Sequence, residues 1–305
     1  MPVRPRPWIC RLTALAPATL LGGCGWIHAP VLNPQGPIAL VQRDLLLTAF
    51  GLMLIVLVPV YVLTIWIVRT YSAKAESDKT GYMPDWSYSI WIDAVIWVVP
   101  AMIVTALGYL VWANTHALDP YKPIASNLPP LEVQVVAQDW KWLFIYPEQD
   151  IATVNELVFP SGRPLSLRLT SDTVMNAFYI AGLGGQIYVM AGMETQLNLL
   201  ADRPTSLRGR NTQYSGRGFS DQHFAANATT QADFDAWVAK ARKSNNPLDA
   251  AAYAALAKPS AKVAPIVYSA VDPGLFGAVI AKYRGGQQHH DHGAMPMPNA
   301  SMGAN

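Results

Sequence analysis

The fold is decided by the stretch Leu45–Val68, LLLTAFGLMLIVLVPVYVLTIWIV, which runs for 24 residues without a charged side chain. An α-helix rises about 1.5 Å per residue, so this stretch is long enough to cross a hydrocarbon core of roughly 30 Å. A second apolar stretch, 90–112, carries a single charged residue, Asp93. Together the two stretches predict a transmembrane helical hairpin over residues 45–113.

The composition agrees with a membrane protein. Of the 305 residues, 51% are hydrophobic and only 14% are charged, whereas soluble domains carry roughly 25% charged residues. The formal net charge is +2, with neither a basic stripe nor a long run of like charge, which argues against a nucleic-acid partner. Both cysteines, Cys10 and Cys24, precede the first span, so the rest of the chain functions without thiols.

The N-terminus has the pattern of an export signal. Three arginines precede an apolar run, 12–21, that ends in Leu-Gly-Gly-Cys24. A basic segment, a short apolar segment and small residues before a cleavage point are typical of a bacterial secretory signal. We therefore predict a signal peptide over residues 1–23. Because Leu-Gly-Gly-Cys resembles the lipobox of bacterial lipoproteins, Cys24 is predicted to become the lipidated N-terminus; the alternative is an ordinary cleavage site that happens to precede a cysteine.

The distribution of basic residues predicts the topology. The loop between the spans, 69–89, holds Arg69, Lys74 and Lys79, and the outer flanks of the two spans hold fewer basic residues. The positive-inside rule places this loop in the cytoplasm and both termini outside, as export by the signal also requires. We therefore expect a multi-pass lipoprotein of the bacterial inner membrane, with residues 24–44 and the C-terminal domain in the periplasm.

Strand patterns follow the second span. Short alternating runs, such as 131–135 and 165–169, are separated by turn signals such as Pro160-Ser161-Gly162, which is typical of a small all-β sandwich. From Thr230 the period becomes helical, and Thr-Gln-Ala-Asp has the pattern of a helix N-terminus. The predicted organisation is a β-sandwich domain over 114–228, a helical C-terminal arm over 229–284 and a disordered, Met- and His-rich tail over 285–305.

A lipidated two-span anchor followed by an exported sandwich resembles subunit II of the haem-copper terminal oxidases, whose outer domain is a cupredoxin-like sandwich. The members that oxidise cytochrome c hold a dinuclear copper centre there, with an upstream His followed by Cys-x3-Cys-x3-His-x2-Met. The corresponding positions here are Asn176, Tyr214, Gly218, Gln222 and Ala225. None of these is a ligand of that centre, and a shift of the alignment by one residue brings in no cysteine. Such centres need thiolate donation, so we expect no metal and no cofactor in this chain.

The missing copper ligands favour one branch of this family, the cytochrome bo-type quinol oxidases. The resemblance covers about 25–284 and is densest in the stretches 47–56, Asp139–Trp142, Tyr146–Gln149 and Gln186–Met193. It implies a non-copper subunit of a proton-pumping oxidase in which subunit I holds the haems and one copper, oxidises ubiquinol and reduces dioxygen to water. The partners implied are subunit I, smaller membrane subunits and membrane lipid.

The resemblance implies a structural and assembly role for this chain, without catalytic residues of its own. The family also has a subunit II carboxylate at the cytoplasmic start of the second span, at the mouth of a proton channel. Asp93 matches that position, where the quinol-oxidase pattern has Glu. The alternative for Asp93 is an interfacial carboxylate that reaches water. Trp140 and Trp142 match an aromatic region that serves electron entry in copper-bearing relatives, and here we expect them to be packing residues.

Two other functions stay open from the sequence. The first is subunit II of a cytochrome c oxidase, against which the absence of cysteines argues; His223 would then have to be a ligand, whereas we interpret it as a surface histidine. The second is a lipid-anchored copper-binding or chaperone protein that uses the tail, since imidazole and thioether both suit copper. The tail residues in question are His289, His290, Asp291, His292, Met295, Met297 and Met302.

Overall fold

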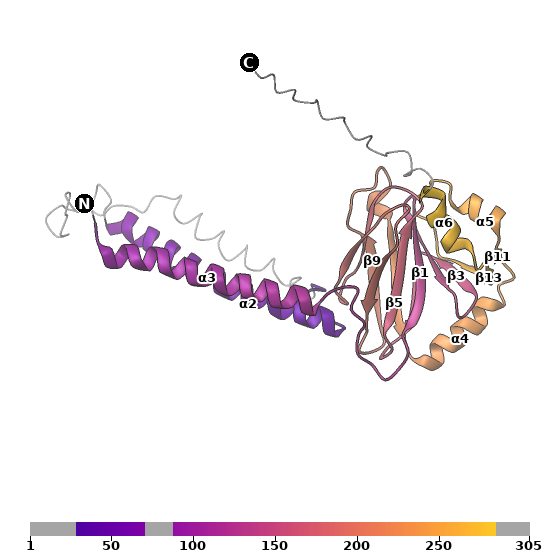
Figure 1. Ribbon diagram of the computed structural model, residues 1–305, viewed down its shortest axis with the longest axis horizontal. Helices are drawn as coiled ribbons and strands as arrows, with labels where there is room; N and C mark the ends of the chain where they lie inside the picture. Colours follow the sequence, from indigo (N-terminus) through magenta and orange to yellow (C-terminus); the bar gives the residue numbers. More distant parts are fainter. Residues whose placement is uncertain (1–28, 71–87, 285–305) are drawn as a thin grey trace, which may run out of the picture.

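The computed structural model describes residues 29–70 and 88–284, which form two long helices, a two-sheet sandwich and a C-terminal arm (Figure 1). The helices approach the sandwich from one side, and the arm covers the opposite side. This order of layers agrees with the predicted class, a membrane-anchored all-β protein with a helical hairpin, a sandwich and a C-terminal arm.

The hairpin consists of α2 (Pro37–Thr70) and α3 (Ile90–Ala117). Both are long and apolar enough to cross a membrane by length and composition. Helix α2 begins eight residues before the charge-free span that starts at Leu45, because Pro37 is well suited to a first helical turn and Ala39 is buried. Helix α2 therefore extends beyond the membrane-length stretch, on its N-terminal side, as far as the sandwich.

The outer ends of both helices are tied to the sandwich. Just before α2, the backbone N–H of Gln35 donates to the carbonyl of Gly182 at 2.8 Å, and its own carbonyl accepts from the N–H of Asp202 at 2.9 Å. A side chain at the next residue, Gly36, would collide with the carbonyl of Leu200, so only glycine permits this approach. After α3, the amide of Asn198 donates to the carbonyls of Pro120 and Lys122.

The sandwich has a six-stranded and a five-stranded sheet. Sheet A has the order β12-β3-β2-β1-β5-β8, and sheet B has the order β4-β10-β9-β6-β7. The strands of sheet A are β1 (Leu131–Gln138), β2 (Lys141–Tyr146), β3 (Ile151–Val154), β5 (Leu165–Ser171), β8 (Thr195–Leu199) and β12 (Ile266–Tyr268). Those of sheet B are β4 (Glu156–Pro160), β6 (Asn176–Ile180), β7 (Gln186–Val189), β9 (Thr205–Asn211) and β10 (His223–Thr229).

The core between the sheets is aromatic. The ring of Phe178 stacks on that of Phe224 at 5.1 Å and meets the edge of Trp142 at 5.2 Å, while Phe144 lies 5.0 Å from Phe224. All four side chains are buried, and each contributes about 2–3 kcal/mol by leaving water. Trp142 is thus a packing residue, as expected. Trp142 and Phe144 belong to β2, which is buried on both faces, whereas β1, β5 and β10 show the alternation of buried and half-buried positions.

The C-terminal arm is helical only in part. Its helices are α4 (Gln231–Arg242), α5 (Ala250–Leu256) and α6 (Leu275–Arg284), and the side chain of Thr230 caps α4 by accepting from the N–H of Asp233. Two short strands, β11 (Pro247–Leu248) and β13 (Ala270–Val271), pair with each other, and β12 adds to the edge of sheet A beside β3. The three helices agree with the predicted helical arm, and β12 was not predicted; it forms because the free edge of β3 accepts a strand.

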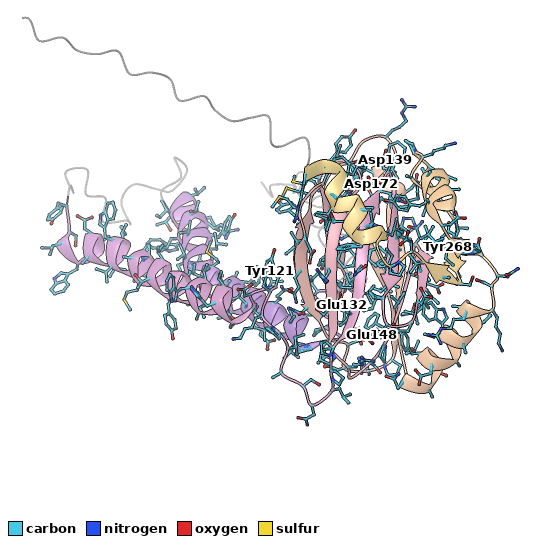
Figure 2. All side chains as sticks on the ribbon, turned by 45° about the vertical axis from the view of Figure 1, so that its right-hand side comes forward. Tyr121, Glu132, Asp139, Glu148, Asp172 and Tyr268 are labelled. Carbon is cyan, nitrogen blue, oxygen red and sulfur yellow. The ribbon has the colours of Figure 1, made fainter. Side chains whose placement is uncertain are left out.

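Two polar contacts fasten the arm to sheet A. The carboxylate of Asp172, whose side chain is only 2% exposed, accepts from Tyr253 at 2.7 Å, Lys282 at 2.7 Å and Tyr283 at 3.0 Å. Asp172 lies beneath the arm at one end of the sheet (Figure 2). The buried ammonium of Lys141 donates to Lys258 O at 2.8 Å and to Ser260 Oγ at 2.7 Å. These contacts fix an arm whose apolar side also packs on sheet A.

Candidate functional site

The structure brings only some of the five copper-ligand positions together. Asn176, at the start of β6, and Gln222, just before β10, are buried, and Gln222 Nε2 donates to Asn176 Oδ1 at 3.0 Å. Tyr214 is 72% exposed, and Ala225 lies on β10 opposite Arg208 of the neighbouring strand. The two positions that correspond to histidine ligands are therefore occupied by amides in direct contact.

A third amide, Asn211, lies at the centre of this cluster. Its Nδ2 donates to Asn176 Oδ1 at 2.7 Å, to Gln222 Oε1 at 2.9 Å and to Ser215 Oγ at 3.1 Å. Its Oδ1 accepts from the backbone N–H of Ala177 at 2.8 Å. Ser215 Oγ donates in turn to Gln222 Oε1 at 2.7 Å. We refer to Asn176, Asn211, Ser215 and Gln222 as the amide network; it links β6 and β9 to the loop 212–222.

The position of the second bridging cysteine, Gly218, is covered by an aromatic ring. A Cβ on Gly218 would lie 2.5 Å from Cγ of Trp140, closer than packed atoms approach. Trp140 has a positive φ of 64°, and its indole N–H donates to Ser215 O at 3.1 Å. The indole thus packs on the loop that surrounds a copper centre in the cytochrome c-oxidising relatives, and Trp140 is a packing residue, as expected.

The residues at this site do not fit a dinuclear copper centre. Soft copper centres of this type take thiolate and imidazole donors, and the network supplies neutral amides and a hydroxyl whose hydrogen bonds are made with one another. Asn211 and Ser215 were not among the residues that the sequence singled out. The sequence could have indicated Asn211, because it continues the inward-facing positions 207, 209 and 211 of β9. An amide at an inward position requires polar partners.

His223 stands outside the amide network. It lies on β10 opposite Arg210, and the pKa of its imidazole is lowered by burial and by the nearby guanidinium of Arg208, against a smaller opposing effect of Asp221. It is half-buried in a pocket on the outer face of sheet B, a surface position of the kind that the sequence suggested.

Asp93 lies in the first turn of α3, where its backbone N–H donates to the carbonyl of Ser89 at 3.0 Å. This is the end of α3 that points away from the sandwich (Figure 1). Its side chain is half-buried by the described part of the chain. Cys24 and the His and Met residues of the tail, 285–305, lie outside the described residues.

Two membrane-length helices joined to a two-sheet sandwich define a membrane-anchored, cupredoxin-like protein. The family model of the COX Aromatic Rich Motif matches residues 242–287, a range that includes most of the described arm. The chain is 48% identical over 266 residues to cytochrome bo(3) ubiquinol oxidase subunit 2 of Pseudomonas putida, covering 87% of this chain and 83% of that protein. It is 45% identical to ubiquinol oxidase subunit 2 of Acetobacter aceti, covering 91% and 89%.

A solved structure also matches. The periplasmic domain of subunit II of cytochrome oxidase from Bradyrhizobium japonicum aligns with a TM-score of 0.37 at 18% identity, covering 40% of this chain and 98% of that one. The sequence relatives decide the family. This chain belongs to the family of cytochrome bo-type ubiquinol oxidase subunit 2, within the haem-copper oxidases.

Proposed function

We propose that this chain is the non-copper subunit II of a proton-pumping terminal oxidase that oxidises ubiquinol and reduces dioxygen to water. Its role is structural and supports assembly beside a subunit I that holds the haems and the copper. The observation that carries this proposal is the amide network, which fills the metal loop of an intact sandwich with neutral, mutually bonded side chains. Electrons that enter from quinol in the membrane need no copper relay in the outer domain.

The chain is anchored in the bacterial inner membrane by the hairpin 45–113 and by a lipid on Cys24, after removal of the signal 1–23. The segment 24–44, the sandwich domain 114–228 and the arm 229–284 lie in the periplasm. Smaller membrane subunits complete the complex. The apolar, exposed surfaces of α2 and α3 support this arrangement, since helices of this kind need lipid or partner helices around them.

The main experiment is purification of the complex from native membranes in mild detergent, followed by oxygen-uptake assays. Ubiquinol and reduced cytochrome c are offered separately, and haem and copper are counted in the same sample. Uptake with ubiquinol alone, with haem and one copper per complex, is the expected result. Uptake with cytochrome c and additional copper would overturn the proposal, and so would recovery of the chain without haem. A chain truncated after residue 284 should retain ubiquinol-driven uptake, which would show that this activity does not depend on the tail.

Asp93 contributes to proton uptake in this proposal. Its place in the first turn of α3, far from the sandwich, supports a position at the cytoplasmic surface. Asp93→Asn keeps the shape of the side chain and removes its ability to carry a proton, so oxygen reduction should slow several-fold while the complex still assembles. Turnover and proton pumping equal to the wild type would make Asp93 an interfacial carboxylate without a role in proton transfer.

A further inference from the structure

The outer face of sheet B carries arginines without carboxylate partners. Arg208 and Arg210 are exposed on β9 and take part in none of the ion pairs formed among residues 29–70 and 88–284. Arg210 has Tyr179 on one neighbouring strand and His223 on the other, and its guanidinium lies 6.0 Å from the Tyr179 ring. This face belongs to the layer nearest the helices (Figure 1), so it looks toward the membrane.

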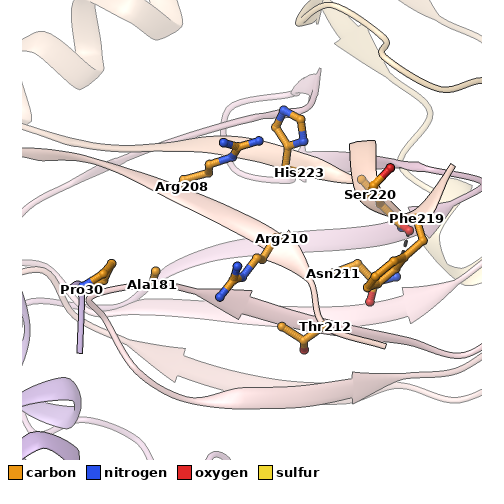
Figure 3. Close-up of a pocket in the computed structure, with 10 residues that line it drawn as sticks. Pro30, Ala181, Arg208, Arg210, Asn211, Thr212, Phe219, Ser220 and His223 are labelled. Atoms are coloured by element: carbon orange, nitrogen blue, oxygen red, sulfur yellow. Dashed lines mark hydrogen bonds between the residues drawn. The ribbon is translucent and has the colours of Figure 1, made fainter. Parts of the chain in front are cut away.

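The two arginines lie in a pocket of about 590 Å³ (Figure 3). His223, Thr212 and Ser220 also line it, so that guanidinium groups, hydroxyls and an imidazole converge on one space. The Nδ1 atom of His223 is buried and has no partner within the described residues. An excess of donors and of positive charge makes this a site for an anionic group, for which arginine offers two parallel N–H donors.

Exposed apolar side chains lie on β7 and on the loops beside the strands of sheet B. Between residues 131 and 284, all of which the structure describes, the exposed large apolar side chains are Val174, Met175, Tyr188, Met193 and Tyr214. Strand register places Tyr188 next to Ala177, whose carbonyl accepts from the backbone N–H of Thr212 in the wall of the pocket. Tyrosine, methionine and arginine are the residues enriched in protein–protein interfaces, so this patch has the composition of a docking surface.

The distance of the pocket from the membrane favours a protein ligand over a lipid ligand. Helix α2 starts eight residues before the charge-free span, so its first residue lies about 12 Å beyond the end of that span. The pocket is lined by Pro30, which precedes the helix in the chain. The headgroup layer is only about 5–8 Å thick on each side of the hydrocarbon core. A lipid phosphate therefore falls short of the pocket, whereas a loop of a membrane protein can reach it.

We infer that Arg208 and Arg210 bind a carboxylate-bearing loop on the outer surface of the membrane subunit beside which this chain assembles. Tyr188 and Tyr214 pack around that contact. The inference rests on the proposed function and adds to it the surface and the charge of the partner. Arginine–carboxylate pairs that are shielded from water are strong and fix the orientation of a complex. Salt weakens the attraction between those charges that stay exposed to solvent.

The first test compares two charge-neutralised forms of the full-length chain in its complex. One is Arg208→Gln with Arg210→Gln; the control is Lys240→Gln with Lys243→Gln, two exposed positions at the end of α4. Complexes are washed at increasing salt, and haem is counted per chain. The arginine variant should lose haem-bearing subunit about tenfold more readily at physiological salt, whereas the lysine control should match the wild type. Equal retention in all three would overturn the inference.

The second test identifies the partner atom. Arg208→Lys and Arg210→Lys keep the charge and supply amines, which a carbodiimide joins to a carboxylate in direct contact. An amide link to an Asp or Glu of the haem-bearing subunit is expected. Lipid is also measured in both complexes. If the wild-type complex retained phosphatidylglycerol and the Gln variant lost this lipid but kept its haem, the ligand would be a lipid and the inference would be overturned. A wild-type chain that carries no haem at any salt would overturn the proposed function itself, and the two failures are therefore distinct.

Discussion

Removing the side chain of Asn211 tests whether the amide network holds the metal loop in place of copper. Asn211→Ala deletes the donor shared by Asn176, Gln222 and Ser215. Asn176 Oδ1 still accepts from Gln222 Nε2, and Gln222 Oε1 still accepts from Ser215 Oγ. The backbone N–H groups of Ala177 and Gln213 both donate to Asn211 Oδ1 in the wild type. Both lose that acceptor, and the N–H of Ala177 loses it in a buried position.

The magnitude follows from these contacts. One orphaned buried donor costs about 1–3 kcal/mol, and the lost hydrogen bonds and the small cavity add roughly 1 kcal/mol. We therefore expect the free energy of unfolding of the outer domain to fall by about 2–4 kcal/mol. For a domain of this size that corresponds to a decrease in Tm of roughly 5–15 °C.

The assay is thermal unfolding of the full-length chain in detergent, followed by near-ultraviolet circular dichroism, to which Trp140 beside the loop contributes. Asn227→Ala is the matched control, because Asn227 is an amide on the outer side of β10 that bonds Ser206; it should cost less than about 1 kcal/mol. If Asn211→Ala were no more damaging than this control, the network would not be holding the loop.

An isosteric variant sharpens the test. Asn211→Asp retains the acceptor for Ala177 and places a carboxylate oxygen next to Asn176 Oδ1 and Gln222 Oε1, where the wild type has a donor. The pKa of the new carboxyl should rise above its ordinary value of about 3.9, because only the protonated form can donate. A folded-state pKa above the unfolded one means that stability is highest below pH about 4 and declines as the pH rises. Stability independent of pH would refute this account.

Three further changes test the surroundings of the site. Gly218→Ala should lower the free energy of unfolding by about 1–3 kcal/mol, because its Cβ displaces the indole of Trp140; in a Trp140→Leu background the loss should largely disappear. Lys141 has a lowered pKa because burial outweighs the attraction of Asp139. Wild-type stability should therefore rise with pH between this lowered pKa and the unfolded-state value of about 10.5, and Lys141→Met should remove this slope in pH-dependent unfolding. Asp172→Asn keeps the hydrogen-bonding shape but removes the anion, so limited proteolysis should release the arm faster than in the wild type, by about tenfold if about 1.4 kcal/mol is lost.

The elements that the sequence predicted are those fixed by local patterns. The hairpin follows from a charge-free run, the inner faces of the sandwich from alternation, and the start of α4 from the capping side chain of Thr230, which is confirmed. Strand β12 was not predicted, because three residues are too few to show a period and the strand exists only through the free edge of β3. Its pairing is a long-range contact, which local patterns do not contain.

The candidate site, like the fold, has a part that the sequence predicts and a part that it does not. The sequence predicts which positions correspond to the copper ligands, because the stretch 214–225 can be aligned with the family motif. The partners that replace the metal could not, since Asn211 lies on a different strand from Asn176 and meets Gln222 only after the sheet has formed. A hydrogen-bond network of this kind depends on tertiary distances, so residue spacing alone predicts which ligands are missing and not what has replaced them.

The amide network and the arginine pocket share residues, so the network also supports the wall of the pocket. Asn211 and Gln222 belong to the network on its inner side and line the pocket on its outer side. A metal would hold the loop by a few strong bonds, whereas the network holds it by several bonds of about 1 kcal/mol each. That is sufficient for a loop whose proposed role is to keep a docking surface in shape. In this proposal the sandwich serves the complex through the surface that it presents to the membrane subunit.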